Sequence, residues 1–346
     1  MNPAIAGALL AAALFGASTP VAKSLAGEMS PVLLAGLLYL GSGAGLSAAR
    51  LLRDRGWRAS GLAAGDFRWL AGAILVGGVL APVLLIHGLA RSSGAAASLL
   101  LNLEAVFTAL LAWLVFRENA GARVVLGMLA IGAGGVVLAW PSQEVADGRG
   151  FGALAVGAAC LCWALDNNLT RRIASADALF IAAAKGLVAG TVNTALAIAS
   201  GAALPNIGPA FAALGTGLFG YGLSLVLFVV ALRELGAART GAYFATAPFI
   251  GAAAAIPMLG EPAPPALWLA AALMGAGVWL HLSERHEHEH THEPIAHAHR
   301  HVHDVHHRHD HDFAWDGREP HAHPHRHEPL THRHPHFPDA HHRHRH

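Results

Sequence analysis

Long uncharged stretches of apolar residues fill residues 1–282 and limit the folds that this chain can adopt. The stretches consist mainly of Ala, Leu, Gly and Val, and about twenty such residues in a helix cross the ~30 Å hydrocarbon core of a bilayer. The sequence therefore predicts an all-α membrane protein, with the lipid bilayer as its surroundings. The ten predicted spans lie near residues 4–25, 30–49, 67–90, 94–116, 121–140, 151–172, 175–200, 206–232, 236–259 and 263–282.

Arginine predicts how these spans are oriented. If the N-terminus is cytoplasmic, the loops on that side hold eleven arginines, whereas the opposite side holds only Arg91 and Arg149. Because positive residues favour the cytoplasmic side, we expect an integral protein of the plasma (bacterial inner) membrane with both termini in the cytoplasm. The eleven are Arg50, Arg53, Arg55, Arg58, Arg68, Arg117, Arg123, Arg171, Arg172, Arg233 and Arg239.

An internal repeat divides the spans into two halves. The segment "FRENAGARVVLGMLAIGAGGVVLAW" (116–140) aligns with "GEPAPPALWLAAALMGAGVWL" (260–280) at an offset of 143, which places Glu118 on Glu261. The opening spans "ALFGASTPVAKSL" and "LCWALDNNLTRRI" align at an offset near 148. We predict one five-helix repeat over 1–140 and another over 151–282. Since five is odd, the second repeat is inverted relative to the first, as in many secondary transporters.

This arrangement resembles the EamA-type drug/metabolite transporter superfamily. The likeness covers residues 4–282 and rests on the five-plus-five repeat, on a Glu that closes the fourth span of each half ("VFRE" and "MLGE"), and on the Gly-rich span that follows. The family more often has tryptophan where this first span reads "LFGAS". The resemblance implies a small-solute carrier, often an exporter, that works by alternating access. It names no particular solute.

Polar residues inside the predicted spans are the candidate site, because such groups normally face the bundle interior or a wet cavity. Glu104 and Lys185 lie near the middle of their spans. They form either a structural ion pair or a substrate or proton site. The offset of 143 places Glu104 on Ala247, so this charge is not duplicated, which favours a site. The other candidates for the pathway are Lys23, His87, Asn102, Asp166 and Asn167.

Several of these residues also have structural interpretations. A lone membrane histidine such as His87 is more often a hydrogen-bonded structural group than a metal ligand, but a proton relay or metal passage would follow if it met Glu104 and Asp166. Glu118 and Glu261 lie at span ends, where capping or pairing with arginine explains them. Proton coupling and a homodimer stay open. No nucleic-acid partner is expected.

The last segment, 283–346, differs from the rest because it holds twenty-three of the 25 histidines. It has almost no apolar periodicity, so it cannot bury a core, and we expect a disordered cytoplasmic tail. Imidazole binds zinc and nickel. The histidines therefore predict that the tail binds Zn²⁺ or Ni²⁺ and either buffers the metal or regulates the protein. The alternative is a solvated extension that has no role or senses pH. The candidate ligands are His286, His288, His290, His292, His297, His299, His301 and His303.

Three function classes were weighed, and two of them remain. The chain has no zinc-protease or phosphate-loop motif and no loop between spans large enough for a catalytic domain, so an enzyme is not expected. A carrier of a small metabolite or drug-like solute, with no required cofactor, is the main prediction. The alternative is a transporter or sensor of a divalent transition metal or of a metal complex, in which the tail is central.

Overall fold

The computed structural model describes residues 3–56, 60–116, 122–139, 150–173, 176–228, 230–231, 240 and 243–283, and four short segments of the tail. The chain divides into two compact units, Met1–Glu284 and Arg285–His346. The candidate ligands His286 and His303, and Glu118, lie outside the described residues.

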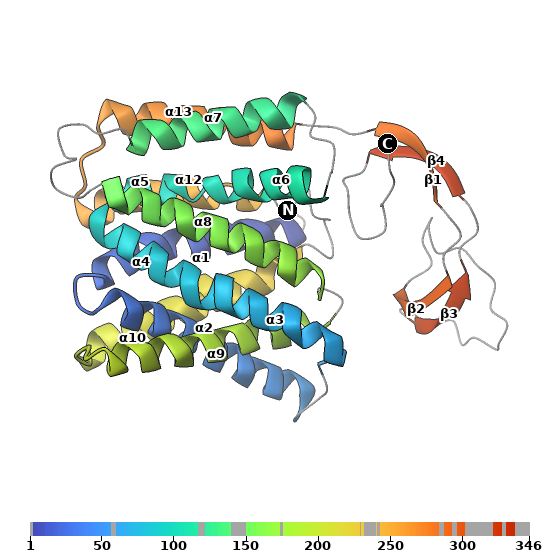
Figure 1. Ribbon diagram of the computed structural model, residues 1–346, viewed down its shortest axis with the longest axis horizontal. Coiled ribbons are helices and arrows are strands. Elements are labelled where there is room, and N and C mark those ends of the chain that lie inside the picture. Colours follow the sequence, from blue (N-terminus) through green and yellow to red (C-terminus); the bar gives the residue numbers. More distant parts are fainter. Residues whose placement is uncertain are drawn as a thin grey trace. The chain divides into compact units, whose positions relative to one another are not determined.

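The first unit is a bundle of helices in stacked layers (Figure 1). Two segments inside it, η2 and η4, are π-helical. The helices are α1 (Pro3–Leu25), α2 (Pro31–Asp54), η1 (Ala64–Asp66), α3 (Phe67–Ala73), η2 (Ile74–Leu80), α4 (Ala81–Arg91), α5 (Gly94–Leu100), α6 (Leu103–Phe116), α7 (Ala122–Ala139), α8 (Gly150–Arg171), α9 (Ala178–Ala199), α10 (Ile207–Thr216), η4 (Gly217–Leu223), α12 (Ala247–Leu259) and α13 (Pro265–Leu282).

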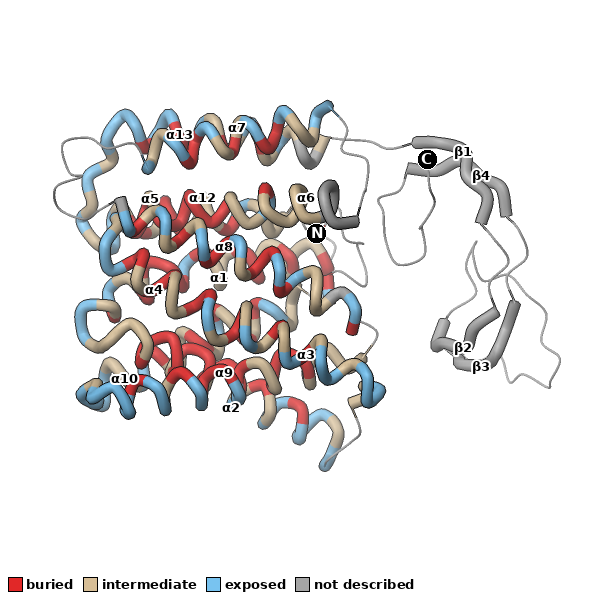
Figure 2. The backbone as a smooth tube through the Cα atoms, viewed as in Figure 1, coloured by how far each residue is buried: buried red, intermediate tan, exposed pale blue. Residues whose placement is uncertain are grey.

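Seven described helical stretches are long and apolar enough to cross a membrane. Two shorter apolar helices, Ala247–Leu259 and Pro265–Leu280, coincide with the last two predicted spans, and α8 coincides with the sixth. Exposed residues lie mainly on the outward faces of the bundle, and buried ones face inward (Figure 2). Large apolar side chains such as Leu129 and Trp279 are more than half exposed, as expected for surfaces that contact lipid. The chain is thus a multi-pass membrane protein.

The two halves of the bundle meet through reciprocal glycine contacts. Gly43 on α2 lies against Gly186 on α9, and neither position has room for a Cβ atom. These two residues are 143 apart, which is the offset found in the sequence. Small residues allow such close approach of membrane helices. A residue that touches its own equivalent marks a pseudo-two-fold axis between the halves.

The helices α7 and α13 pack in the same reciprocal way. A Cβ atom on Gly134 would lie 2.7 Å from the Cγ of Met274, and one on Gly277 would lie 2.6 Å from the Cγ1 of Ile131. Both the two glycines and the two partners are related by the offset of 143. This pair of helices therefore lies on the same pseudo-two-fold axis as α2 and α9.

The π-helical segments repeat at the same offset. The segment η2 spans Ile74–Leu80 and η4 spans Gly217–Leu223, so each residue of η2 has an equivalent 143 positions later. Gly77 of η2 packs on Asp166 of α8, and its equivalent Gly220 packs on Ser18 of α1. The third span of each half thus contacts the first span of the other half through an irregular segment.

Polar contacts join helix ends at each of the two ends of the bundle. Asp177, which precedes α9, accepts hydrogen bonds from Arg50 (2.9 Å) and Arg53 (2.6 Å) at the end of α2. Burial alone would raise the pKa of Asp177. These hydrogen bonds and one from the Leu179 amide outweigh that effect and lower the pKa to about 2. At the same end, Arg123 donates to the carbonyl of Ser283 at 3.1 Å.

The opposite end of the bundle has its own contact. The Glu261 carboxylate accepts from the amides of Gly94 (2.6 Å) and Ala95 (3.0 Å) in the first turn of α5. This agrees with the capping role that the sequence predicts for Glu261, because a carboxylate satisfies the free N–H groups of a helix start.

The described parts of the tail form strands, which differs from the disorder expected from the sequence. β1 (Glu287–His292) pairs with β4 (Leu330–Pro335), and β2 (Ala296–His301) pairs with β3 (His321–Arg326), both antiparallel. The expectation of disorder relied on the lack of an apolar core. It did not weigh the alternation of histidine with other residues, a period of two that an extended strand accommodates.

The glycine contacts at the axis yield a stability prediction. Replacing Gly43 by Ala should destabilise the folded protein by about 1–3 kcal/mol, because the added methyl would overlap the backbone of α9. Gly132→Ala is the matched control, since nothing lies within 4 Å of its Cβ position. Thermal unfolding in detergent measures both variants. Equal melting of Gly43→Ala and Gly132→Ala would contradict the close packing of α2 on α9.

Candidate functional site

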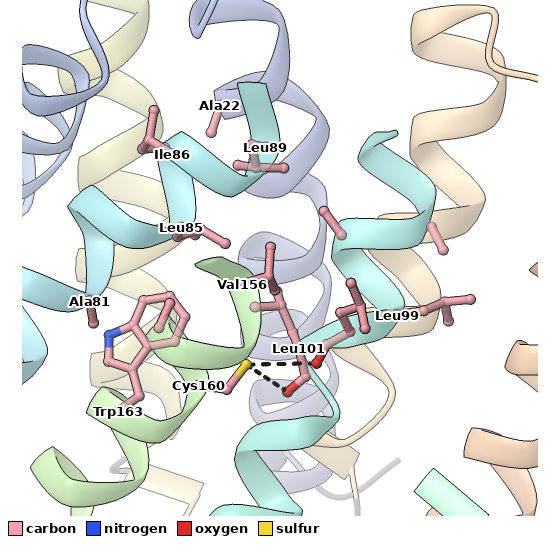
Figure 3. Packing of buried hydrophobic residues seen from close by; sticks show 14 of the residues in the cluster. Ala22, Ala81, Leu85, Ile86, Leu89, Leu99, Leu101, Val156, Cys160 and Trp163 are labelled. Carbon is pink, nitrogen blue, oxygen red and sulfur yellow. Dashed lines mark hydrogen bonds between the residues drawn. The ribbon is translucent and has the colours of Figure 1, made fainter. Parts of the chain in front are cut away.

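The fourth predicted span is not one helix but is interrupted between α5 and α6, at Leu101 and Asn102. An interruption frees backbone carbonyls, which need other partners inside a bilayer. The Asn102 amide donates to the Leu99 carbonyl at 2.9 Å, and the Cys160 thiol lies 3.7 Å from the carbonyl oxygen of Leu100. Figure 3 shows this thiol directed from α8 toward the interruption. The Leu99 and Leu101 carbonyls also accept backbone N–H groups three residues later in the chain, so the side chains add to these bonds at the interruption.

Glu104 lies in the first turn of α6, directly after the interruption. Its Oε1 accepts a hydrogen bond of 2.8 Å from the Nδ2 of Asn167 on α8. Within the described part of the chain, the half-buried carboxylate has no ion-pair partner. The start of a helix favours negative charge, but an unpaired carboxylate at this depth is costly.

Asp166, the residue before Asn167, forms the ion pair of this region. Its Oδ2 lies 2.5 Å from the Nζ of Lys185 on α9, and the two side chains are only 6% and 15% exposed. The Thr170 hydroxyl donates to the other carboxylate oxygen at 3.0 Å. The partner of Lys185 is therefore Asp166. The ion pair between Lys185 and Glu104, one of the two interpretations from sequence, is wrong, because Asp166 satisfies the lysine from the neighbouring helix.

The π-helical segment η2 closes one side of this region. The Gly77 carbonyl accepts hydrogen bonds from the Tyr39 hydroxyl (2.9 Å) and from the indole N–H of Trp163 (3.1 Å). The Gly77 Cα lies directly against the Asp166 carboxylate, where a Cβ atom would not fit. Only glycine at this position lets η2 approach the ion pair. The widened π turn exposes its carbonyl to donors from α2 and α8.

We call Glu104, Asn167, Asp166 and Lys185 the charged cluster. It joins α6, α8 and α9, so it draws on both halves of the bundle. With both carboxylates ionised, its formal charge is −1. A site of this kind can bind a small polar solute, or hold and release a proton, at mid-membrane depth.

Three other candidates lie apart from the charged cluster. The Nδ1 of His87 is 2.9 Å from the Val83 carbonyl oxygen one turn earlier in the same helix, so the meeting with Glu104 and Asp166 is not observed. Lys23 donates to the Leu89 carbonyl at 2.5 Å. Asn102 supports the interruption, as described above. These contacts are structural in kind.

The charged cluster has no equivalent in the other half. Its charges Glu104, Asp166 and Lys185 fall on Ala247, Ser18 and Ser42 under the sequence offsets of 143, 148 and 143. The interruption itself does recur, because α12 also begins after a short turn at residues 245–246. The helical scaffold is therefore duplicated, whereas the charged residues have uncharged equivalents in the other half.

No resident metal site is apparent in the part of the chain whose side chains are described, because no three His, Cys, Asp or Glu residues gather there. Cys160 and Cys162 are free thiols.

Sequence reasoning missed Tyr39 and Trp163 as donors to η2. Trp163 is buried, and its indole N–H bonds to the Gly77 carbonyl. Thr170 was missed as well. Its spacing of four residues from Asp166 on a helix is the signal that could have indicated the contact.

Known proteins resemble this chain over the helical unit. The EamA-like transporter family model matches residues 2–140 and 150–283, one match for each half. An uncharacterized transporter of Methanothermobacter thermautotrophicus (strain Delta H) is 30% identical over 270 residues, which cover 73% of this chain and 78% of that protein. A solved crystal structure shares the fold with a TM-score of 0.57 and 22% identity, over 80% of this chain and 95% of the other.

These matches agree with the architecture built from the residues. Two family matches fall on the two halves that the glycine contacts and the π-helical segments relate. The resemblance drawn from the sequence is confirmed, and the chain belongs to the EamA-like transporter family.

Proposed function

We propose that the protein is a secondary transporter that exports a small metabolite or drug-like solute by alternating access. The charged cluster is the observation that carries this proposal. A buried ion pair and an unpaired carboxylate lie beside an interrupted helix and a π-helical segment, and transporters build substrate sites on such discontinuous helices. The two halves would rock about the pseudo-two-fold axis and open the cluster to each side in turn.

The contacts at the helix ends support ten spans in two inverted repeats. Arg123 and Ser283, at the beginning of α7 and just after α13, lie at the same end of the bundle as Arg50 and Asp177. The first half would begin at that end, and the second half, at Gly150, at the other. Arginines gather at the first end, so the positive-inside rule makes it cytoplasmic.

The tail supports a second, metal-binding role. The register of β2 and β3 places His297 opposite His325, His299 opposite His323 and His301 opposite His321. In β1 and β4, His288 is opposite His334 and His290 is opposite His332. Histidine is a ligand of Zn²⁺ and Ni²⁺, and its repetition in the paired strands supplies several donors.

The carrier role is tested by a double-mutant cycle on the ion pair. Asp166→Asn or Lys185→Met alone should reduce both thermal stability and transport, because each leaves a buried charge without its partner, at a cost of about 3–5 kcal/mol. The double variant should recover stability but not transport of the solute identified by screening a knockout strain. Recovery of transport by the double variant would show that the pair is only structural.

The orientation is tested by labelling intact cells in a background without Cys160 and Cys162. A cysteine in place of Arg55 or in the tail should resist a membrane-impermeant thiol reagent, whereas one in place of Asp147 should react. The reason is the excess of arginine on the predicted cytoplasmic side. Labelling of the tail cysteine in intact cells would reverse the orientation.

The tail is tested by calorimetry on the full-length protein and on a variant that ends at Ser283. The full chain should bind several equivalents of Zn²⁺ at about pH 7.5 and lose them at about pH 5, because imidazole protonates near pH 6.5. The shortened chain should keep solute transport. No difference in zinc binding between the two proteins would contradict a metal-binding tail, and loss of all transport on truncation would favour metal as the cargo.

A further inference from the structure

The charge balance of the cluster indicates what it binds. Lys185 forms an ion pair of 2.5 Å with Asp166, and both side chains are largely buried. Glu104 receives only the neutral amide of Asn167, through its Oε1. Its Oε2 accepts no hydrogen bond from any described residue. Within the described part of the bundle, Oε2 of Glu104 therefore has no hydrogen-bond donor, and the lysine of the cluster, Lys185, is already paired with Asp166.

Among the residues that the structure describes, none provides a second cation near Glu104. The helix α8 contributes Asp166 and the Cys160 thiol, α9 contributes Lys185, and α2 contributes the hydroxyl of Tyr39. The helix α7 has one described charged residue, Arg123, which bonds to Ser283 at the end of the bundle. An ionised Glu104 thus leaves a net charge of −1 in the membrane interior, where an uncompensated charge is unfavourable.

We propose that Glu104 binds the protonated amine of an organic solute and that this amine displaces a proton from the carboxyl group. In the absence of solute, the proton neutralises Glu104. On binding, the O–H bond breaks, the proton leaves to water, and the ammonium group donates an N–H hydrogen bond to Oε2. Both occupants carry one positive charge, so the cluster stays neutral in either state. This proposal deepens the transporter function proposed above and depends on it for its physiological meaning.

The asymmetry of the repeat supports this assignment. The position equivalent to Glu104 is Ala247, at the start of α12 after the matching interruption. The fold therefore forms this helix start without a carboxylate. A charge that the scaffold does not need, placed where a helix start favours a carboxylate, is suited to a ligand that carries the opposite charge.

The experiment measures proton release on amine binding by purified protein in weakly buffered, sodium-free detergent solution. The probes are a panel of amines, headed by phenethylamine and hexylamine, with phenethyl alcohol and hexanol as uncharged analogues. The wild type should release up to one proton per chain with amines and none with the alcohols. Infrared difference spectra should show loss of one protonated carboxyl band on binding.

Three variants make the outcome decisive. Glu104→Gln should abolish proton release and weaken amine binding by about tenfold or more, since a charge-assisted hydrogen bond is lost. Glu104→Asp should keep proton release, which separates loss of the carboxyl group from misfolding. Glu28→Gln, a change in an exposed loop, should behave as wild type. Thermal unfolding of each variant is measured in parallel.

The proposal is overturned if no amine releases a proton, if Glu104→Gln releases as many protons as wild type, or if sodium alone produces the release. The transporter function is judged separately, by flux of labelled amine into liposomes. Proton release without flux would keep amine binding and remove the carrier function. If amine flux is the same in Glu104→Gln as in the wild type, the carrier function is kept and amine binding at Glu104 is rejected.

Discussion

Backbone hydrogen bonding inside a bilayer limits where the helices of this bundle can be irregular. A helix that crosses hydrocarbon must satisfy its own carbonyls, and each irregularity needs a donor from another helix. The bundle has such irregularities at η2, at η4 and between α5 and α6. Tyr39 and Trp163 supply donors for η2, Asn102 and Cys160 for the interruption, and these donors tie α2 and α8 to the irregular segments. The charged cluster forms at the centre of this network.

The duplicated scaffold and the single charged cluster have different consequences. Reciprocal contacts at Gly43 and Gly186, and again between α7 and α13, give the halves two equivalent packing arrangements. Such symmetry allows a carrier to exchange inward and outward states of similar free energy. The charges break this symmetry, because Asp166 contacts η2 whereas its equivalent Ser18 contacts η4. An ion pair on one side only would bias the exchange toward one state, and occupancy at Glu104 would alter that bias.

Much of this architecture could be predicted from the sequence, and the remainder could not for physical reasons. Hydropathy located the apolar helices, and the repeat at an offset of 143 located the two halves, because both can be recognised from the order of residues alone. The partner of Lys185 could not be inferred, since two carboxylates on different helices compete for it and only packing decides between them. The interruption before Glu104 was missed because Leu101 and Asn102 carry no strong helix-breaking signal. The strands of the tail were missed because composition was weighed above alternation.

Transport by alternating access, as proposed above, requires that the charged cluster opens to each side of the membrane in turn. Accessibility of a single cysteine at Asn167, in a background without Cys160 and Cys162, tests it most directly. Asn167 is exposed and bonded to Glu104. An impermeant thiol reagent should label Asn167→Cys in both right-side-out and inside-out vesicles, whereas a cysteine at the fully buried Ala8 should remain unlabelled in both. Labelling of Asn167→Cys from one side only, or from neither, would contradict alternating access to this site.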